Sequence, residues 1–121
     1  MISSIQHVSI PVTNQDRALK FYTEKLGFEV LLDHDFGEEL RWIELKLKNG
    51  LTKLILQTLE GQENKVGGIS NVIFYTDDVK KTYDELTKLG VEFTVTPTDE
   101  SWGMYCMMKD SEGNVFCVSS S

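Results

Sequence analysis

Hydrophobic and polar positions alternate along HVSIPV (7–12), and the segment is rich in β-branched residues. This pattern predicts a strand. Asn14 then offers an N-cap, and apolar residues recur at helical spacing as far as Leu26. Gly27 stands where a left-handed residue usually ends a helix, and FEVLL (28–32) resumes as a strand. The first quarter of the chain therefore reads as strand, helix and strand.

The same pattern returns later in the chain. NVIFYT (71–76) predicts a strand, Asp77 or Asp78 caps a second helix, and Gly90 ends that helix. The helix ends are nearly identical, with KLGFEV at 25–30 and KLGVEF at 88–93. Further strand signals and a glycine turn follow each copy. We interpret the repeat as a duplicated βαβββ module, because matching order and turns are improbable by chance.

The repeat defines the expected organisation. We predict one domain over residues 1–121, with module one at 5–59, a polar, glycine-rich linker at 60–68 and module two at 69–120. The fold class is α+β, with two βαβββ modules whose mixed sheets curl around a pocket. One helix covers only one face of a four-stranded sheet, so each sheet keeps a second face.

The strand patterns indicate what that second face carries. In RWIELKL (41–47), Ile43 and Leu45 share the apolar face and leave Trp42 and Glu44 opposite. The other strands place these residues on the second faces by the same parity: His7, Ser9, Lys46, Lys53, Ile55, Gln57, Asn71, Ile73, Tyr75 and Cys117. This mixture of aromatic, apolar and a few polar groups is typical of a ligand pocket.

Charge and composition narrow the classes of function. The net charge is −7 and the pI about 4.7, and the basic residues are scattered, so we expect no nucleic-acid partner. No apolar run is long enough to cross a bilayer, and the first residues lack the pattern of a secretory signal. We expect a soluble cytoplasmic protein without a membrane partner. The two cysteines do not make a disulfide scaffold.

These segments resemble the vicinal oxygen chelate superfamily, which includes glyoxalases, bleomycin-resistance proteins and extradiol dioxygenases. The resemblance rests on HVSIPVTNQDRALKFYTEKLGFEV, on NVIFYTDDVKKTYDELTKLGVEF and on the closing WGMYCMMKDSEGNVFCVS. In the closing turn Asp110, Gly113 and Asn114 keep the family pattern, whereas Ser111 and Glu112 replace Pro and Asp. The resemblance spans residues 5 to 119 and implies paired βαβββ modules, a cupped pocket and a homodimer.

The resemblance also implies where a metal would bind. Glyoxalase-type members hold a divalent ion through His, Glu, His and Glu on the first and fourth strands of each module. Carried onto this chain, His7 matches, and the other three positions fall on Gln57, Asn71 and Cys117. A site without metal is therefore our first interpretation. If a divalent metal does bind, the candidate ligands are His7, Cys117 and Glu44.

The expected function is the binding of a small organic molecule, without cofactor. The candidate ligand-binding residues are His7, Glu44, Gln57, Asn71, Tyr75, Trp102 and Cys117. Catalytic residues are not assigned, and the sequence leaves open whether the protein is an enzyme. The alternatives are a metal-dependent lyase or dioxygenase with an altered ligand set, an acid/base pair of His7 and Glu44, and an interaction module that has lost chemistry.

Overall fold

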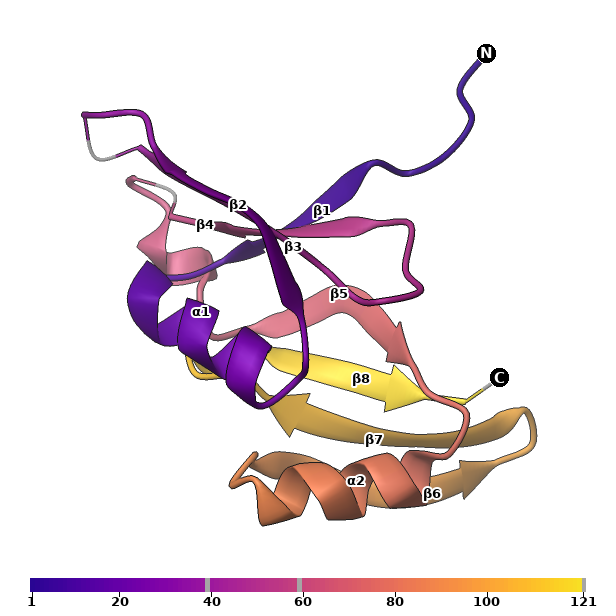
Figure 1. The fold of residues 1–121 in the computed structure, drawn as a ribbon. Helices are drawn as coiled ribbons and strands as arrows, with labels where there is room; N and C mark the ends of the chain where they lie inside the picture. Colours follow the sequence, from indigo (N-terminus) through magenta and orange to yellow (C-terminus); the bar gives the residue numbers. More distant parts are fainter. Residues whose placement is uncertain (39, 59, 121) are drawn as a thin grey trace. The chain divides into compact units, whose positions relative to one another are not determined.

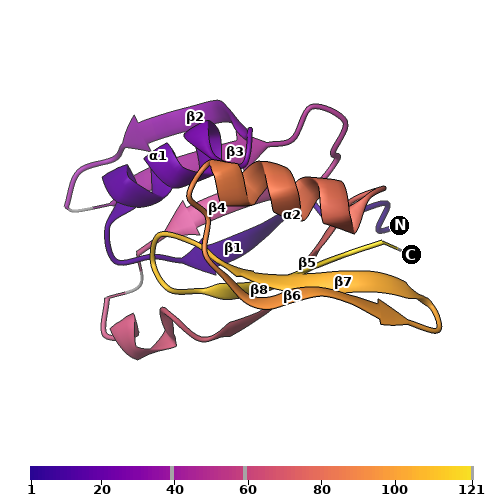
Figure 2. The same ribbon diagram turned by 90° about the horizontal axis from the view of Figure 1, so that it is seen from below.

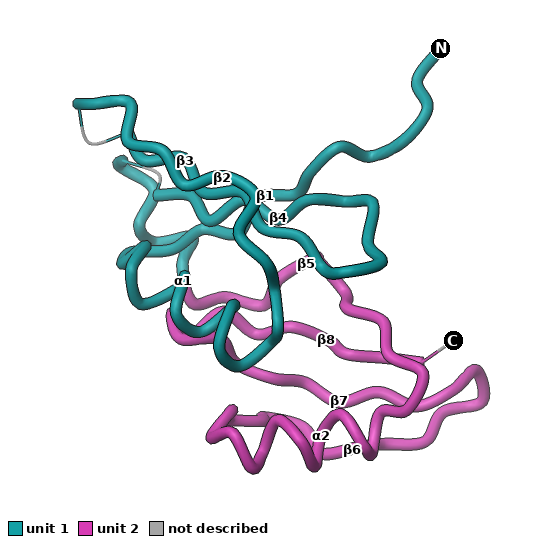
Figure 3. The backbone as a smooth tube through the Cα atoms, in the orientation of Figure 1, with its two compact units in different colours: residues 1–66 teal, residues 67–121 magenta. Residues whose placement is uncertain are grey.

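The structure, a computed structural model, describes residues 1–38, 40–58 and 60–120. The chain divides into two compact units, unit 1 at 1–66 and unit 2 at 67–121 (Figure 3). This boundary falls inside the stretch 60–68 that the sequence indicates as a linker. The predicted end of module one, Leu59, lies outside the described residues.

Unit 1 has the order strand, helix and three strands. Its elements are β1 (His7–Pro11), α1 (Gln15–Glu24), β2 (Glu29–Asp35), β3 (Arg41–Lys46) and β4 (Lys53–Gln57), followed by the short 3-10 helix η1 (Glu63–Lys65) (Figure 1). The sheet order is β1-β4-β3-β2, with β1 parallel to β4 and the other pairs antiparallel. Pro11 ends β1, an edge strand, where its missing N–H costs no ladder hydrogen bond.

Unit 2 repeats this order. Its elements are β5 (Ile69–Tyr75), α2 (Val79–Lys88), β6 (Phe93–Glu100), β7 (Gly103–Lys109) and β8 (Val115–Ser119), and its sheet order is β5-β8-β7-β6. Figure 2 shows α2 lying along this sheet. Two mixed four-stranded sheets, each with one helix, confirm the predicted α+β fold of two βαβββ modules.

Both helices begin at predicted caps and are followed by the predicted glycines, although α1 ends at Glu24, two residues before Leu26. The side chain of Asn14 accepts a 2.9 Å hydrogen bond from the backbone N–H of Arg17, which caps α1. Asp78, the second of the two candidate caps, accepts from Lys81 at 3.0 Å. Gly27 and Gly90 follow the helices at φ of +79° and +89°, a region that residues with a Cβ rarely enter.

Each unit builds its own core between its helix and one face of its sheet. The buried core residues of unit 1 include Ile10, Ala18, Tyr22, Ile43, Leu45, Leu54 and Leu56. Those of unit 2 include Val79, Val91, Cys106, Met108, Phe116 and Val118. Successive strand residues point to opposite faces, so these positions fix which side chains lie on the face away from the helix.

The closing turn of unit 2 is held by two buried polar side chains. Asp110 accepts hydrogen bonds from the backbone N–H groups of Glu112 and Asn114 and from the Asn114 amide. The Oδ1 atom of Asn114 accepts from the N–H of Gly67 at 2.7 Å. Asp110 and Asn114, two of the three residues that keep the family pattern here, are therefore structural, because their side chains bond each other, the turn and the N–H of Gly67.

Candidate functional site

The face of the unit 1 sheet that points away from α1 is called the unit 1 open face. By register it carries the residues that the strand parity predicts: His7, Ser9, Trp42, Glu44, Lys46, Lys53, Ile55 and Gln57. His7 and Ser9 are exposed, whereas most of the others are half-buried. The sequence placed these side chains on one face, and the sheet registers show which are neighbours.

Glu44 lies at the centre of a polar network on this face. Trp42 Nε1 donates a 2.9 Å hydrogen bond to Glu44 Oε2, and Lys53 Nζ lies 3.3 Å from Glu44 Oε1. The hydrogen bond from Trp42, and then the ammonium of Lys53 and the imidazole of His7, lower the pKa of Glu44 against the opposing effect of desolvation. Both carboxylate oxygens are thus engaged, and the group stays ionised in a fixed orientation.

His7 reaches the same network from the far side of β4. Its ring meets the Trp42 indole edge to face, with centroids 6.1 Å apart. Because β4 lies between β1 and β3, the two rings approach each other across β4. Ile55 of β4 also lies on the open face, and it is only 1% exposed. Gln57 is on the same face, in register with Pro11.

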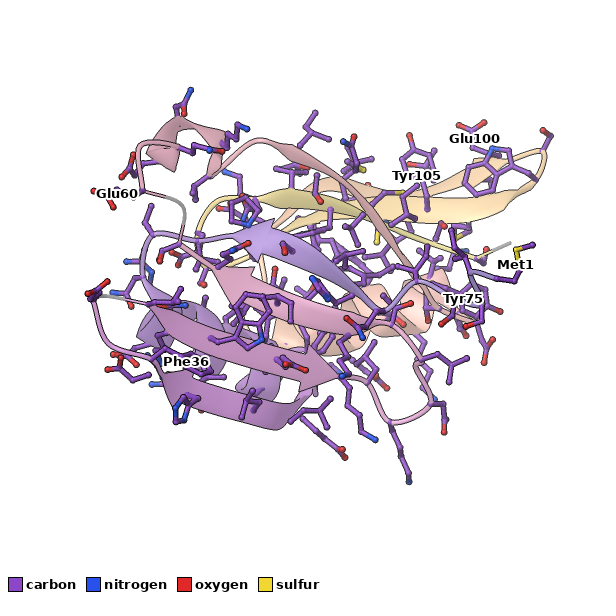
Figure 4. The ribbon with its side chains drawn as sticks, turned by 90° about the horizontal axis from the view of Figure 1, so that it is seen from above. Met1, Phe36, Glu60, Tyr75, Glu100 and Tyr105 are labelled. Carbon is purple, nitrogen blue, oxygen red and sulfur yellow. The ribbon has the colours of Figure 1, made fainter. Side chains whose placement is uncertain are left out.

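Unit 2 has a different open face. The side of its sheet away from α2 carries Asn71, Ile73, Tyr75, Tyr105, Met107 and Cys117, and we call it, together with Trp102, the unit 2 open face. Ile73 is 63% exposed, Tyr75 66% and Trp102 54%. The hydroxyl of Tyr75 donates to Asp77 at 2.7 Å, and Trp102 stacks on Tyr105 with centroids 6.2 Å apart (Figure 4 labels both tyrosines). This face is mainly apolar and aromatic.

The two cysteines of unit 2 point to opposite faces. Cys106 pairs with Val118 on the helix side, whereas Cys117 pairs with Met107 and Ile73 on the open side. Burial, and then the neighbouring Cys117, raise the pKa of Cys106 to about 11, and burial also raises the pKa of Cys117. Both thiols are therefore protonated at neutral pH. A thiolate nucleophile or ligand would need a nearby cation, which burial alone does not supply.

The donor set does not fit a divalent metal of the glyoxalase type. Glu44 already accepts from Trp42 and Lys53, and a cation would have to displace an ammonium. Gln57 and Asn71 offer neutral amides, and the Cys117 thiol is protonated. Among the residues that the structure describes, no three His, Cys, Asp or Glu side chains converge in a group that could hold a metal ion.

Unit 1 also contains a cavity of about 490 Å³ away from the candidate residues. It is lined by Val12, Thr13, Gln15, Glu38, Leu40, Thr58, Glu60, Glu63 and Val66. None of the seven residues that the sequence singles out for ligand binding lies on its wall. Gln15 is occupied there, since its amide donates to the backbone oxygens of Arg41 and Leu56 at 2.8 and 3.0 Å.

The residues of the two open faces that were not among the sequence's ligand-binding candidates include Lys46, Lys53 and Tyr105. Lys46 and Lys53 share the face of Glu44 by strand alternation. The sequence therefore already indicated two charged side chains on this face. Tyr105 lies opposite Ser119 on the unit 2 open face. Its position follows from the alternation of GMYCMMK (103–109), in which Cys106 and Met108 are the buried partners.

Comparison with known proteins identifies the family. The sequence profile described as the Glyoxalase/Bleomycin resistance protein/Dioxygenase superfamily matches residues 4–118. The chain belongs to this superfamily. The resemblance drawn from its motifs is thereby confirmed, and the two βαβββ modules are those of this superfamily's fold.

Individual relatives are consistent with this placement. The chain is 34% identical over 118 residues to the uncharacterized protein YetH of Bacillus subtilis, covering 98% of each chain. A superfamily member from Sphaerobacter thermophilus has a solved structure with a TM-score of 0.89 at 28% identity, covering 99% of this chain and 98% of that one. TnmS3, an antibiotic binding protein from Streptomyces sp. CB03234, is 30% identical, with a TM-score of 0.85 and coverage of 98% and 96%.

Within the described residues, no helix is both long enough and apolar enough to cross a bilayer.

Proposed function

We propose that this protein binds a small organic molecule on its open sheet faces, without a divalent metal centre. The observation that carries the proposal is the exposure of Ile73, Tyr75 and Trp102 on one sheet face of unit 2. Large apolar side chains gathered on an exposed face mark an interaction or ligand site more often than they occur without a role. The solved relative TnmS3, an antibiotic binding protein, supports a binding role.

The candidate residues then take two kinds of role. Tyr75 and Trp102 supply flat apolar surface for a ring, and Cys117 supplies a small uncharged contact between Ile73 and Met107. On unit 1, His7, Glu44 and Gln57 supply hydrogen-bonding groups, while Asn71 does so on unit 2. Glu44 is preorganised by Trp42 and Lys53, so it binds a ligand donor without first having to be ordered.

The proposal is tested by thermal denaturation with a panel of small aromatic compounds that includes 2-naphthamide. A compound present at a hundred times its Kd raises the unfolding free energy by about 2.7 kcal/mol, a shift of several degrees. The shift should disappear in Tyr75→Ala and Trp102→Ala. Leu51→Ala is the matched control, because Leu51 is an exposed apolar residue in a turn of unit 1. A panel without any stabilising compound, or equal loss in the control, would contradict the proposal.

The two tryptophans make the binding event visible residue by residue. The chain has only Trp42 and Trp102, one on each open face. Fluorescence of Trp42→Phe reports Trp102 alone, and fluorescence of Trp102→Phe reports Trp42 alone. A ligand on both faces changes both signals, whereas a ligand on one face changes one.

The metal-dependent alternative makes a separate prediction. A lyase or dioxygenase with an altered ligand set requires Glu44 to exchange the ammonium of Lys53 for the metal. Titration calorimetry with Zn²⁺, Ni²⁺, Fe²⁺ and Mn²⁺ distinguishes the two, since stoichiometric binding that is lost in Glu44→Gln would favour the alternative. The expected homodimer stays a prediction, to be checked by analytical ultracentrifugation.

A further inference from the structure

One end of the unit 1 open face carries a row of basic side chains. His7 on β1 is in register with Lys53 on β4. On the other side of Lys53, the β3–β4 pairing ends with Leu45 opposite Leu54, and extending this antiparallel register by one residue aligns Lys46 with Lys53. All three side chains point away from α1, and we call His7, Lys46 and Lys53 the basic row.

This arrangement is unfavourable for the isolated sheet. Like charges directly opposite each other on one face destabilise a strand pair, and their Cβ atoms are about 5 Å apart. The row is also exceptional in a chain whose net charge is −7. Two lysines side by side on a half-buried sheet face therefore indicate that something of opposite charge belongs between them.

The acidic groups near the row do not satisfy it. Glu44 engages Lys53, and its second oxygen is taken by the N–H of Trp42. Glu29 is opposite Lys46 at the exposed edge strand β2. Within the described residues, however, the ammonium of Lys46 has neither an ion pair nor a hydrogen bond. Three sets of donors are therefore available to a ligand: the N–H groups of the Lys46 ammonium, those of Lys53 that do not face Glu44, and the imidazole N–H of His7.

We propose that the basic row binds an oxyanion group of the small molecule, a carboxylate or a phosphate. Charge-assisted hydrogen bonds from ammonium groups to an oxyanion are short and strong, and an anion between Lys46 and Lys53 removes their repulsion. The ion pair with Glu44 holds the Lys53 ammonium over the sheet, so Lys53 meets the ligand in a defined position. The inference rests on the proposed function in one respect, that the ligand lies on the unit 1 open face.

The test compares two compounds that share a naphthalene ring and differ only in the head group. The full-length protein is titrated with 2-naphthoate and with its neutral isostere 2-naphthamide at constant pH and ionic strength, and the binding is followed by NMR. The imidazole resonances of His7 and the amides of Lys46 and Lys53 should move with naphthoate, and naphthoate should bind at least tenfold more tightly than the amide. His34, the other histidine of the chain, packs on Phe36 and is the internal control.

Variants of the row sharpen the test. Lys46→Gln should weaken naphthoate binding about tenfold and leave naphthamide binding unchanged, and Lys53→Gln should weaken naphthoate binding by a similar factor. Lys80→Gln is the matched control, because it removes the same charge from an exposed position on α2 of unit 2. Inorganic phosphate is the second probe. If it displaces naphthoate, the row takes oxyanions in general, and if it does not, the row takes carboxylates.

The outcomes separate this inference from the proposed function. If naphthamide binds as tightly as naphthoate and Lys46→Gln changes the affinity of neither compound, the inference of an oxyanion site at the basic row is wrong and the proposed function stands. Shifts spread over all lysines, or equal weakening by Lys80→Gln, show unspecific charge attraction and also overturn it. If naphthoate moves only the basic row while no neutral compound binds either face, the anion site stands and the proposed ligand contacts of Tyr75 and Trp102 on the unit 2 open face are wrong.

Discussion

The indole N–H of Trp42 donates to Oε2 of Glu44, two residues along β3, at 2.9 Å. The two side chains share a face because strand residues alternate, so the bond forms within one strand. It fixes the orientation of the indole and the carboxylate relative to each other. The ring of His7 then packs against the oriented indole, and the ammonium of Lys53 pairs with the oriented carboxylate.

Replacing Trp42 by Phe should release Glu44 while keeping an aromatic ring. The hydrogen bond from Trp42 is the largest cause of the lowered pKa of Glu44, so we expect this pKa to rise toward its ordinary range in Trp42→Phe. An NMR titration of the glutamate carboxyl carbon measures it. Phe21→Leu, a change of aromatic residue on α1 away from the sheet's open face, should leave the pKa of Glu44 where it is.

Arg41→Lys should destabilise unit 1 by about 1 kcal/mol. Arg41 binds Asp33 through Nε and Nη2, each at 2.8 Å, and its Nη1 reaches Asp16 at the start of α1. Lysine cannot reproduce this fork. Urea denaturation measures the difference, with Lys48→Arg as an exposed control outside the ion pairs.

The same pair gives a prediction for acid pH. The guanidinium of Arg41 lowers the pKa of Asp33, so the native state holds its proton less tightly than the unfolded chain does. The stabilisation is present above the ordinary carboxyl pKa of about 4 and is lost as the pH falls through the lowered value. The stability difference between the wild type and Arg41→Lys should therefore shrink as the pH falls below the ordinary carboxyl pKa and through the lowered pKa of Asp33. A difference independent of pH would contradict this assignment.

Asn114→Ala should be the most damaging of these changes. Asn114 is 3% exposed, accepts from the N–H of Gly67 and donates to Asp110. Its loss leaves a backbone donor and a carboxylate oxygen without these partners, at a cost of about 2–3 kcal/mol. Thermal unfolding measures the effect. Ser111→Ala in the same turn is the control, since its hydroxyl bonds the side chain of the neighbouring Glu112.

The two thiols should differ in their reaction with a disulfide reagent such as DTNB. Cys106 is fully buried and its pKa is raised to about 11, so it should react only on unfolding. Cys117 is half-buried on the unit 2 open face and should react first, faster as the pH rises. Native Cys117→Ser should show almost no labelling. A ligand on the open face should slow the labelling of Cys117 in the wild type.

Much of this architecture was readable from the chain. The Lys-Leu-Gly helix ends and the Asx caps at Asn14 and Asp78 are local signals, because a cap or a left-handed glycine acts within a few residues. Period-two alternation is also local, and it placed His7, Glu44, Gln57 and Cys117 on the faces away from the helices. The sequence did not indicate which of those residues are partners, since a partner sits on another strand.

What the chain by itself determined, then, is the pair of βαβββ modules and the face to which each strand residue points. Only the tertiary structure decided that Glu44 binds Trp42 and Lys53, that the rings of His7 and Trp42 meet across β4, and that the strand register aligns Lys46 with Lys53. The physical reason is register. Alternation determines which face of the sheet each side chain of a strand points to. The lateral neighbour of a side chain depends instead on how strands far apart in the sequence align. A one-residue slip in that alignment changes every pair.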